Sequence, residues 1–211
     1  MRHLLIILFI FLFSFVIFSC GEKEESTDST ATTTSNPLFV SVGNSGTILT
    51  STDGTTWTSK TSGTDEHLYG VTYANSTFVV VGDNDTGSGT GTILTSTDGT
   101  TWTSRTSGTS NDLYGVTYGN STFVAIGYNG TILTSSDGTT WTSRTSDAMY
   151  GTNFRGITYG NGLFVIVGGY YNGTIVTSSD GISWTSSTLD MSFTVVGSSH
   201  LNIIYGVTYI E

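Results

Sequence analysis

A phrase of twelve residues occurs four times in the chain, and this repetition limits the fold more than any other feature. The first copy, GTILTSTDGTTW, returns letter for letter in the second, and the third and fourth differ from it at one and at four positions. The four terminal tryptophans are 45, 39 and 43 residues apart. A repeat of this length is one supersecondary unit that buries its apolar faces only against its neighbours. The copies span Gly46–Trp57, Gly91–Trp102, Gly130–Trp141 and Gly173–Trp184.

Each unit contains four segments that are typical of short strands. In the second unit these begin with Tyr69–Tyr73 and the continuous apolar run Phe78–Gly82, which indicates a strand covered on both faces. The third strand is the Thr-Ile-Leu-Thr-Ser of the phrase. The fourth follows the tryptophan, is polar and carries a cation in three copies, as expected of an outer edge strand. Units of this kind are typical of propeller blades, so the sequence predicts an all-β, four-bladed β-propeller.

The two ends of the repeat region predict how the ring closes. The region begins with a second strand, so the first blade lacks its first strand, and it ends with a first strand that no blade follows. We therefore expect Tyr205–Tyr209 to pair with Phe39–Gly43 and to close a monomeric ring of four blades. The alternatives are a fragment of a larger ring, or two copies joined into eight blades. The predicted propeller spans residues 38–211, with repeats near 38–68, 69–113, 114–153 and 154–203 and a closing strand at 204–210.

An Asp-Gly pair in every repeat predicts a hairpin turn between the third and fourth strands. An aspartate side chain can accept hydrogen bonds from backbone N–H groups of its own turn, and glycine takes the positive φ that the turn requires. The segment Ser51–Trp57 and its counterparts resemble the Asp box of sialidases and related BNR-type propellers, as found in repeat lipoproteins of bacteria. Because a catalytic carboxylate is needed only once, we interpret the turn as structural. Its residues are Asp53, Gly54, Trp57, Asp98, Gly99, Trp102, Asp137, Gly138, Trp141, Asp180, Gly181 and Trp184.

The N-terminus is typical of a secretory signal. Two polar residues follow the initial methionine and precede the apolar run Leu4–Phe18, which is shorter than the roughly 20 residues of a membrane-spanning helix. The segment Ile17–Cys20 resembles the bacterial lipobox, in which cleavage leaves a lipidated cysteine as the first mature residue. We expect a signal peptide at 1–19, then the lipidated Cys20 and a flexible tether over 20–37. The protein would be exported and lipid-anchored to the bacterial cell envelope, at the outer membrane or cell surface.

The loops of the predicted ring vary between repeats on one face only. The first-to-second and third-to-fourth turns are uniform, whereas the second-to-third loops and the links between blades differ in every copy. Asp83–Thr90 is an eight-residue insertion, and Gly169–Asn172 carries two tyrosines. Because binding residues belong on loops that a rigid scaffold holds, the variable face is the candidate ligand site. Its candidate residues are Tyr128, Tyr170, Tyr171, Asp83 and Asp85.

Composition and residue types exclude several classes of function. A formal net charge of −10 repels phosphate backbones, so we expect no nucleic-acid partner. The chain lacks the arginine cluster that a sialidase needs, and nothing singles out a glycosidase pair of carboxylates. Its three histidines form no zinc pattern, so we expect no metal and no cofactor. We predict a non-catalytic binding module for a glycan or protein ligand. The alternatives are a degenerate glycosidase or sialidase-like enzyme, or a structural or assembly factor of the envelope.

Overall fold

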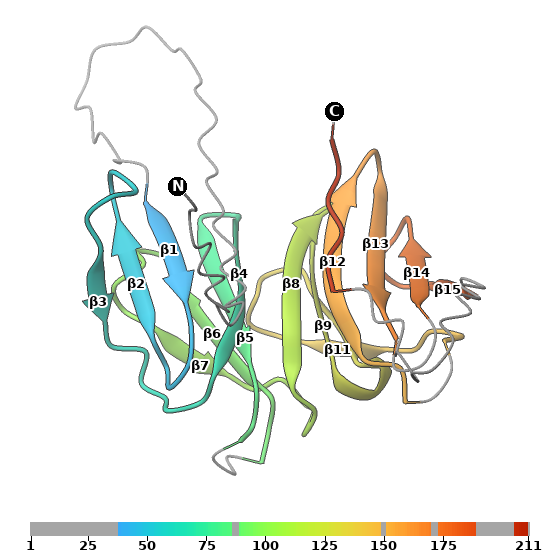
Figure 1. Cartoon of the computed structure of the whole chain (residues 1–211), viewed down its shortest axis with the longest axis horizontal. Coiled ribbons are helices and arrows are strands. Elements are labelled where there is room, and N and C mark those ends of the chain that lie inside the picture. The colour runs from blue at the N-terminus through green and yellow to red at the C-terminus, as the bar shows by residue number, and fades with distance from the viewer. Residues whose placement is uncertain (1–37, 86–88, 149–150, 170–172, 189–204, 211) are drawn as a thin grey trace, which may run out of the picture.

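The computed structural model describes residues 38–85, 89–148, 151–169, 173–188 and 205–210, and in these residues the chain is all-β (Figure 1). The strands form four separate antiparallel sheets, three with four strands and one with three. Each sheet is one predicted blade, and the four blades follow one another along the chain. The prediction of an all-β propeller with four blades is therefore confirmed.

The strands of each blade pair in the order in which they occur in the chain. Blade 1 contains β1 (Phe39–Val42), β2 (Ile48–Ser51) and β3 (Thr58–Lys60). Blade 2 contains β4 (Leu68–Ala74), β5 (Thr77–Gly82), β6 (Thr92–Ser96) and β7 (Thr103–Arg105). Blade 3 contains β8 (Leu113–Gly119), β9 (Thr122–Gly127), β10 (Ile132–Ser135) and β11 (Thr142–Arg144), with the 3-10 turn η1 (Tyr128–Gly130) after β9. Blade 4 contains β12 (Phe154–Gly160), β13 (Leu163–Gly168), β14 (Thr174–Ser178) and β15 (Thr185–Thr188).

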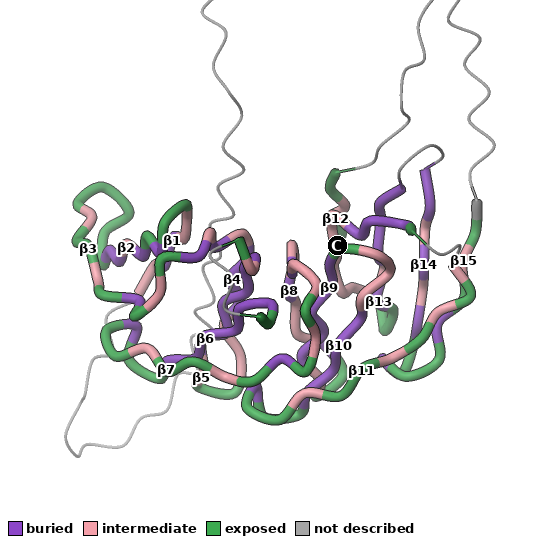
Figure 2. Tube along the Cα trace, turned by 90° about the horizontal axis from the view of Figure 1, so that it is seen from below, coloured by how far each residue is buried: buried purple, intermediate pink, exposed green. Residues whose placement is uncertain are grey.

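Apolar side chains pack between neighbouring blades, because alternate residues of a strand face opposite sides of its sheet. In β5, Val79 and Val81 face blade 3, while Phe78 and Val80 face blade 1. The same alternation in β9 places Phe123 against blade 2. Three cores result, between blades 1 and 2, 2 and 3, and 3 and 4. Figure 2 shows buried residues along the strands and exposed residues mainly in the turns at their ends.

The predicted closing contact differs from the observed one. The described residues include no strand paired with the free edge of β1, and Tyr205–Ile210 lies against β12 without forming a strand. A Cβ built on Gly156 would come within 2.9 Å of the Cα of Gly206, and one on Gly160 within 2.2 Å of the Tyr209 ring. The C-terminal segment thus occupies the place of the next inner strand, but β1 lies at the other end of the arc of blades (Figures 1 and 2). The predicted pairing of Tyr205–Tyr209 with Phe39–Gly43 is not formed, because the C-terminal segment lies against β12, at the end of the arc opposite to β1.

The chain segments that the structure describes contain no helix long and apolar enough to cross a membrane. The predicted signal peptide, Cys20 and the tether over 20–37 lie outside the described residues.

Candidate functional site

The inner strands of blades 2, 3 and 4 share a β-bulge near their first residue. The register against the second strand shifts between Leu68 and Gly70 in β4, and in the same way in β8 and β12. The residue inside the bulge is left without a cross-strand partner, and a bulge turns such a side chain away from the regular alternation. These bulge residues are Tyr69, Tyr114 and Arg155, and Tyr205 holds the matching place in the C-terminal segment.

All four of these positions line one cavity of about 770 Å³. Its wall also contains residues of blade 1, such as Val42 and Asn44, and the carboxylates Asp83, Asp85 and Asp112. Asp83 directly follows β5 and Asp112 directly precedes β8, so the cavity lies at the blade ends that carry the variable loops. Three carboxylates and a single guanidinium make the lining acidic on balance.

Arg155 occupies the place of a tyrosine in the other inner strands. Its guanidinium carbon lies 4.2 Å from the centroid of the Tyr114 ring, which is a cation–π contact. The Tyr114 ring in turn lies 5.7 Å from the Tyr69 ring, so the three side chains form a continuous row. The Nε of Arg155 is buried and has no hydrogen-bond partner among the described residues. A buried donor without a partner is uncommon and costly, which marks this atom as a point where a ligand group could bind.

Asp83, in the wall of the cavity, joins Tyr69 of β4 to the backbone just before that strand. Its side chain is 2% exposed, and its Oδ1 accepts a hydrogen bond of 2.8 Å from the backbone N–H of His67. Its Oδ2 accepts a second, also of 2.8 Å, from the Tyr69 hydroxyl. Burial and this bond to Asp83 raise the pKa of Tyr69 far above its ordinary value, so the phenol stays protonated at neutral pH.

Blade 3 repeats this arrangement in a weaker form. The Tyr114 hydroxyl donates to Oδ2 of Asp112 over 3.2 Å, and the aspartate is only half-buried. Burial raises the pKa of Tyr114 to about 12, although the nearby Arg155 acts in the opposite direction. Both inner-strand tyrosines therefore present neutral hydroxyl groups beside carboxylates.

The predicted ligand-binding residues are only partly brought together. Asp83 and Asp85 line the cavity, although Asp83 is buried and already accepts two hydrogen bonds. Tyr128 is 48% exposed on η1 and is not part of the cavity wall. Tyr170 and Tyr171 lie outside the described residues.

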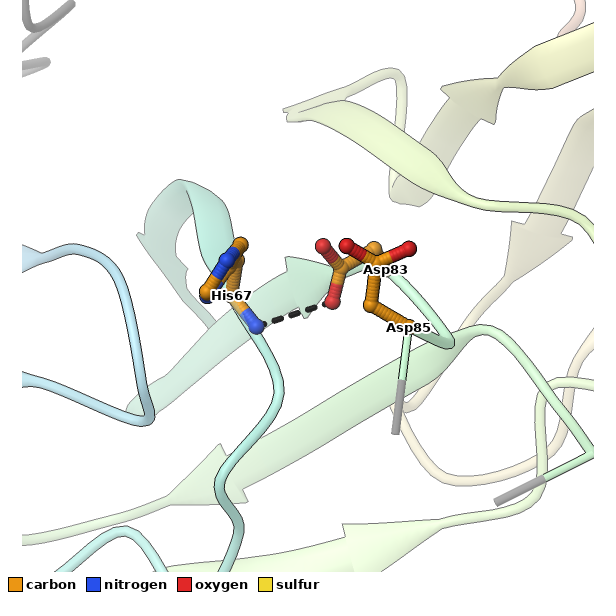
Figure 3. A group of neighbouring side chains, drawn as sticks. All are labelled: His67, Asp83 and Asp85. Carbon is orange, nitrogen blue, oxygen red and sulfur yellow. Dashed lines mark hydrogen bonds between the residues drawn. The ribbon is translucent and has the colours of Figure 1, made fainter. Parts of the chain in front are cut away.

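His67, Asp83 and Asp85 form the one His/Asp group among the described residues whose ligand atoms lie within 4.8 Å of one another (Figure 3). The Nδ1 of His67 already accepts a hydrogen bond of 3.0 Å from the backbone N–H of Ser45. Both oxygens of Asp83 are engaged as well. These contacts engage His67 and Asp83 and hold the loops beside the cavity in place.

The Asp-Gly turns have nearly the same geometry in every blade. In blade 2, Oδ1 of Asp98 accepts hydrogen bonds from the backbone N–H groups of Thr101 and Thr100 and from the Ser96 hydroxyl, all between 2.7 and 2.9 Å. These bonds lower the pKa of Asp98 to about 2, and the backbone N–H groups of the fourth turn lower that of Asp180 to the same level. The indole Nε1–H of each tryptophan donates to the carbonyl of the turn glycine. The aspartates are thus engaged within their own turns, which favours a structural role.

The inner-strand row of Tyr69, Tyr114 and Arg155 was not among the residues predicted from the sequence. Such positions lie in segments that look uniform, and the prediction considered only the loops. The available signal was the inner strand of blade 4, Phe154–Gly160, which carries arginine before its first glycine where those of blades 2 and 3 carry tyrosine. A change of residue type at one repeated position indicates a local role that the repeat does not require.

Comparison with known proteins places the chain among β-propeller-like structures. No protein-family model and no curated protein sequence matches it. A structure of YCF48 bound to D1 peptide is 19% identical, with a TM-score of 0.57, over 74% of this chain and 51% of that chain. YCF48 from Cyanidioschyzon merolae is 16% identical, with the same TM-score, over 75% and 55%. The computationally designed Ika8 protein is 13% identical, with a TM-score of 0.55, over 82% and 50%. The chain therefore spans about half the length of these solved structures.

Proposed function

We propose that the protein is a non-catalytic binding module and that its ligand enters the cavity lined by Tyr69, Tyr114 and Arg155. The observation that carries the proposal is the Nε of Arg155, which is buried without a hydrogen-bond partner among the described residues, at a position where blades 2 and 3 carry tyrosine. A ligand that accepts a hydrogen bond from this atom would remove the cost of leaving it unpaired.

The chemistry of the cavity favours a peptide segment over a glycan. Sugars are commonly held by stacking on a free aromatic face, but Arg155 covers one face of the Tyr114 ring at 4.2 Å. The guanidinium can instead bind a carboxylate of a peptide, either a side chain or a C-terminus, in a charge-assisted contact. Asp85 is exposed in the lining of the same cavity and can accept from the N–H groups or basic side chains of the same segment.

A solved structure of similar fold supports a protein ligand. YCF48, which this chain resembles at a TM-score of 0.57, has been solved with a bound D1 peptide. At 19% identity, the comparison shows a similar fold and does not identify the ligand of this chain. The peptide proposal therefore rests on the lining of the cavity, to which this neighbour adds a precedent for the fold.

The proposed setting of this module is the bacterial cell envelope. We propose that Cys20 is lipidated after signal cleavage and that residues 20–37 tether the propeller to the membrane, at the outer membrane or cell surface. The segment is acidic and then rich in serine and threonine, a composition typical of a flexible linker. The variable loops would then be free to meet a partner carried by another envelope or surface protein.

A binding screen on the full chain in detergent tests the proposal. The probes are an array of peptides, each with a free and an amidated C-terminus and with acidic or amide side chains, and a glycan array. We expect peptides with an accessible carboxylate to bind, and Arg155→Ala to remove that binding. Arg105→Ala is the matched control, because Arg105 lies on the edge strand β7, where its Nε donates to Thr95.

Three results would contradict the proposal in whole or in part. Binding to glycans alone would overturn the peptide ligand while keeping a binding role. Peptide binding that survives Arg155→Ala and Asp85→Asn would move the site away from the cavity. Hydrolysis of a fluorogenic glycoside by the wild-type chain would overturn the non-catalytic assignment itself.

A further inference from the structure

The three cores between blades are built by one rule. In each pair of neighbouring blades, the blade that comes earlier in the chain contributes two residues of its second strand and one of its third. In blade 2 these are Val79, Val81 and Ile93. The following blade contributes a phenylalanine and a leucine or valine, and its tryptophan packs against the same core. In blade 3 the first two are Phe123 and Leu133, both at most 1% exposed. Every core therefore joins two different and complementary faces.

Blade 1 presents the second kind of face, and no blade formed by the described residues packs against it. The residues equivalent to Phe123, Leu133 and Trp141 are Phe39, Leu49 and Trp57, and all three are only half-buried and belong to none of the three cores. The turn glycines give the same result. A Cβ on Gly99, Gly138 or Gly181 would contact the preceding blade, whereas one on Gly54 would meet only Phe39 of its own blade.

Blade 4 presents the first kind of face, and it too is incompletely covered. Val165 and Ile175 are half-buried, whereas the equivalent Val124 and Ile132 of blade 3 are completely buried. The Tyr205–Ile210 segment lies beside this face, against β12, where the inner strand of a following blade belongs. Its side chains are largely exposed, with Tyr205 at 69%. The two ends of the arc are thus the two halves of one further junction.

The curvature of the arc keeps these two halves apart within one chain. Between 74% and 82% of this chain aligns with only 50% to 55% of three solved chains of similar fold. An arc that fits half of a longer propeller-like structure turns too little per blade to close on itself. The free edge of β1 and the C-terminal segment accordingly lie apart in the arc (Figure 1), although residues of both line the cavity.

We infer that two copies of this chain join end to end, each placing its C-terminal segment against β1 of the other. The sequence supports this pairing, because Tyr205–Tyr209 reads YGVTY, identical to the inner-strand segments Tyr69–Tyr73 and Tyr114–Tyr118. In blade 2, Val71 pairs with Val80 and Thr72 with Val79. By the same register Val207 of one copy pairs with Ser41 of the other.

Two such junctions are related by a two-fold axis that passes through the centre of the ring. They leave neither copy with an unpaired β1 edge. Each junction buries the face of Phe39, Leu49 and Trp57 against Val165 and Ile175 of the other copy. The wall of the cavity then passes from one copy to the next, because both Val42 and Tyr205 line it. The binding site of the proposed function is thus completed by the second copy, although the pairing itself does not depend on which ligand binds.

Engineered disulfides test this pairing in the full chain, exported in a bacterial host whose periplasm supports disulfide formation. The variant Ser41→Cys with Val207→Cys places two cysteines on one face at directly paired positions. We expect more than half of the protein to run as a covalent dimer on a non-reducing gel and to return to monomer on reduction. Chains that carry Ser41→Cys alone and Val207→Cys alone, with different tags and produced together, should form a mixed dimer.

The control is Ser41→Cys with Thr208→Cys, since a shift of one residue turns the side chain to the opposite face and should abolish the cross-link. Each single variant also reports any cross-link made by Cys20. A disulfide within one chain would show that the ring closes on itself and would overturn the inference. A ladder beyond the dimer, or no cross-link at all, would overturn it equally, and none of these results depends on peptide binding.

Discussion

The guanidinium of Arg155 lies 4.2 Å above the ring of Tyr114, so that one strand of blade 4 and one of blade 3 meet in the cavity through a cation and an aromatic face. Both residues sit in a β-bulge, where the regular alternation of the strand is interrupted. The fold thus uses the same local irregularity in three blades and changes only the side chain in one of them. This contact holds the guanidinium against the ring, while its buried Nε has no hydrogen-bond partner in the part of the chain that the structure describes.

The hydrogen bond between Tyr69 and Asp83 predicts that Tyr69→Phe lowers the stability of the fold more than Tyr114→Phe does. Tyr69→Phe removes a donor from a carboxylate that is 2% exposed, and we expect unfolding to become easier by about 1–3 kcal/mol. Tyr114→Phe is the matched variant, and should cost under about 1 kcal/mol because Asp112 is half-buried and its bond is 3.2 Å long. Urea denaturation of both variants measures the difference. Equal losses of unfolding free energy in the two variants would show that the bond to Asp83 stabilises the fold no more than the bond to Asp112.

The Asp-Gly turns predict a loss of stability in acid. The pKa of Asp98 and of Asp180 falls from 3.8 to about 2 in the folded chain. Between these values the unfolded chain binds more protons than the folded one, so the stabilisation is present above pH 3.8 and declines as the pH falls toward 2. Thermal melts between pH 6 and pH 2 should show this decline, and Asp98→Asn should make it shallower. Asp65→Asn, which changes an exposed aspartate outside the turns, serves as the control.

The four repeated tryptophans are not equal in the folded chain. Trp184 is 6% exposed in the core between blades 3 and 4, whereas Trp102 is only half-buried against the core between blades 1 and 2. We expect Trp184→Ala to cost about 3–5 kcal/mol, the usual range for a buried tryptophan. Trp102→Ala should cost less, because less apolar area returns to water. Chemical denaturation decides the order, and a larger loss for Trp102 would contradict the assignment of the cores.

If Cys20 is lipidated, substitution of this one residue should change whether the protein is found in the membrane fraction. The full chain should sediment with membranes and incorporate labelled palmitate, because several acyl chains anchor a protein stably. Cys20→Ala removes the acceptor, so the label should be lost. Ser19→Ala, which leaves the thiol, is the control. Palmitate incorporation that persists in Cys20→Ala would exclude Cys20 as the site.

The blades could be predicted from the sequence because strand and turn signals are local and occur four times. The period of the tryptophans, the apolar second strand at Phe78–Gly82 and the Asp-Gly turns each depend on a few neighbouring residues. Closure could not be predicted in this way. Closure of the ring depends on the angle between neighbouring blades. That angle is set by packing between blades, such as that of Val79 and Phe123, and cannot be predicted from the sequence of a single repeat.

The candidate site was predicted only in part, for a physical reason. Asp83 and Asp85 were found because they lie in an insertion, and both line the cavity. Arg155 was not predicted because its position in the cavity depends on a β-bulge that turns a strand residue inward. No local sequence pattern indicates that bulge. Asp83 also has a task that an exposed loop residue would not have, since it is buried and holds Tyr69 and His67.

The most direct test of the binding proposal is the affinity of the full chain for a carboxylate-bearing peptide selected in the screen, measured by titration calorimetry. We expect Arg155→Tyr, which restores the residue of blades 2 and 3, to keep the thermal stability of the wild type and to weaken binding at least tenfold, about 1.4 kcal/mol. Arg105→Ala should bind like the wild type, and amidation of the peptide carboxylate should reproduce the loss caused by Arg155→Tyr. Equal affinities of the wild type and Arg155→Tyr for the peptide would contradict the account.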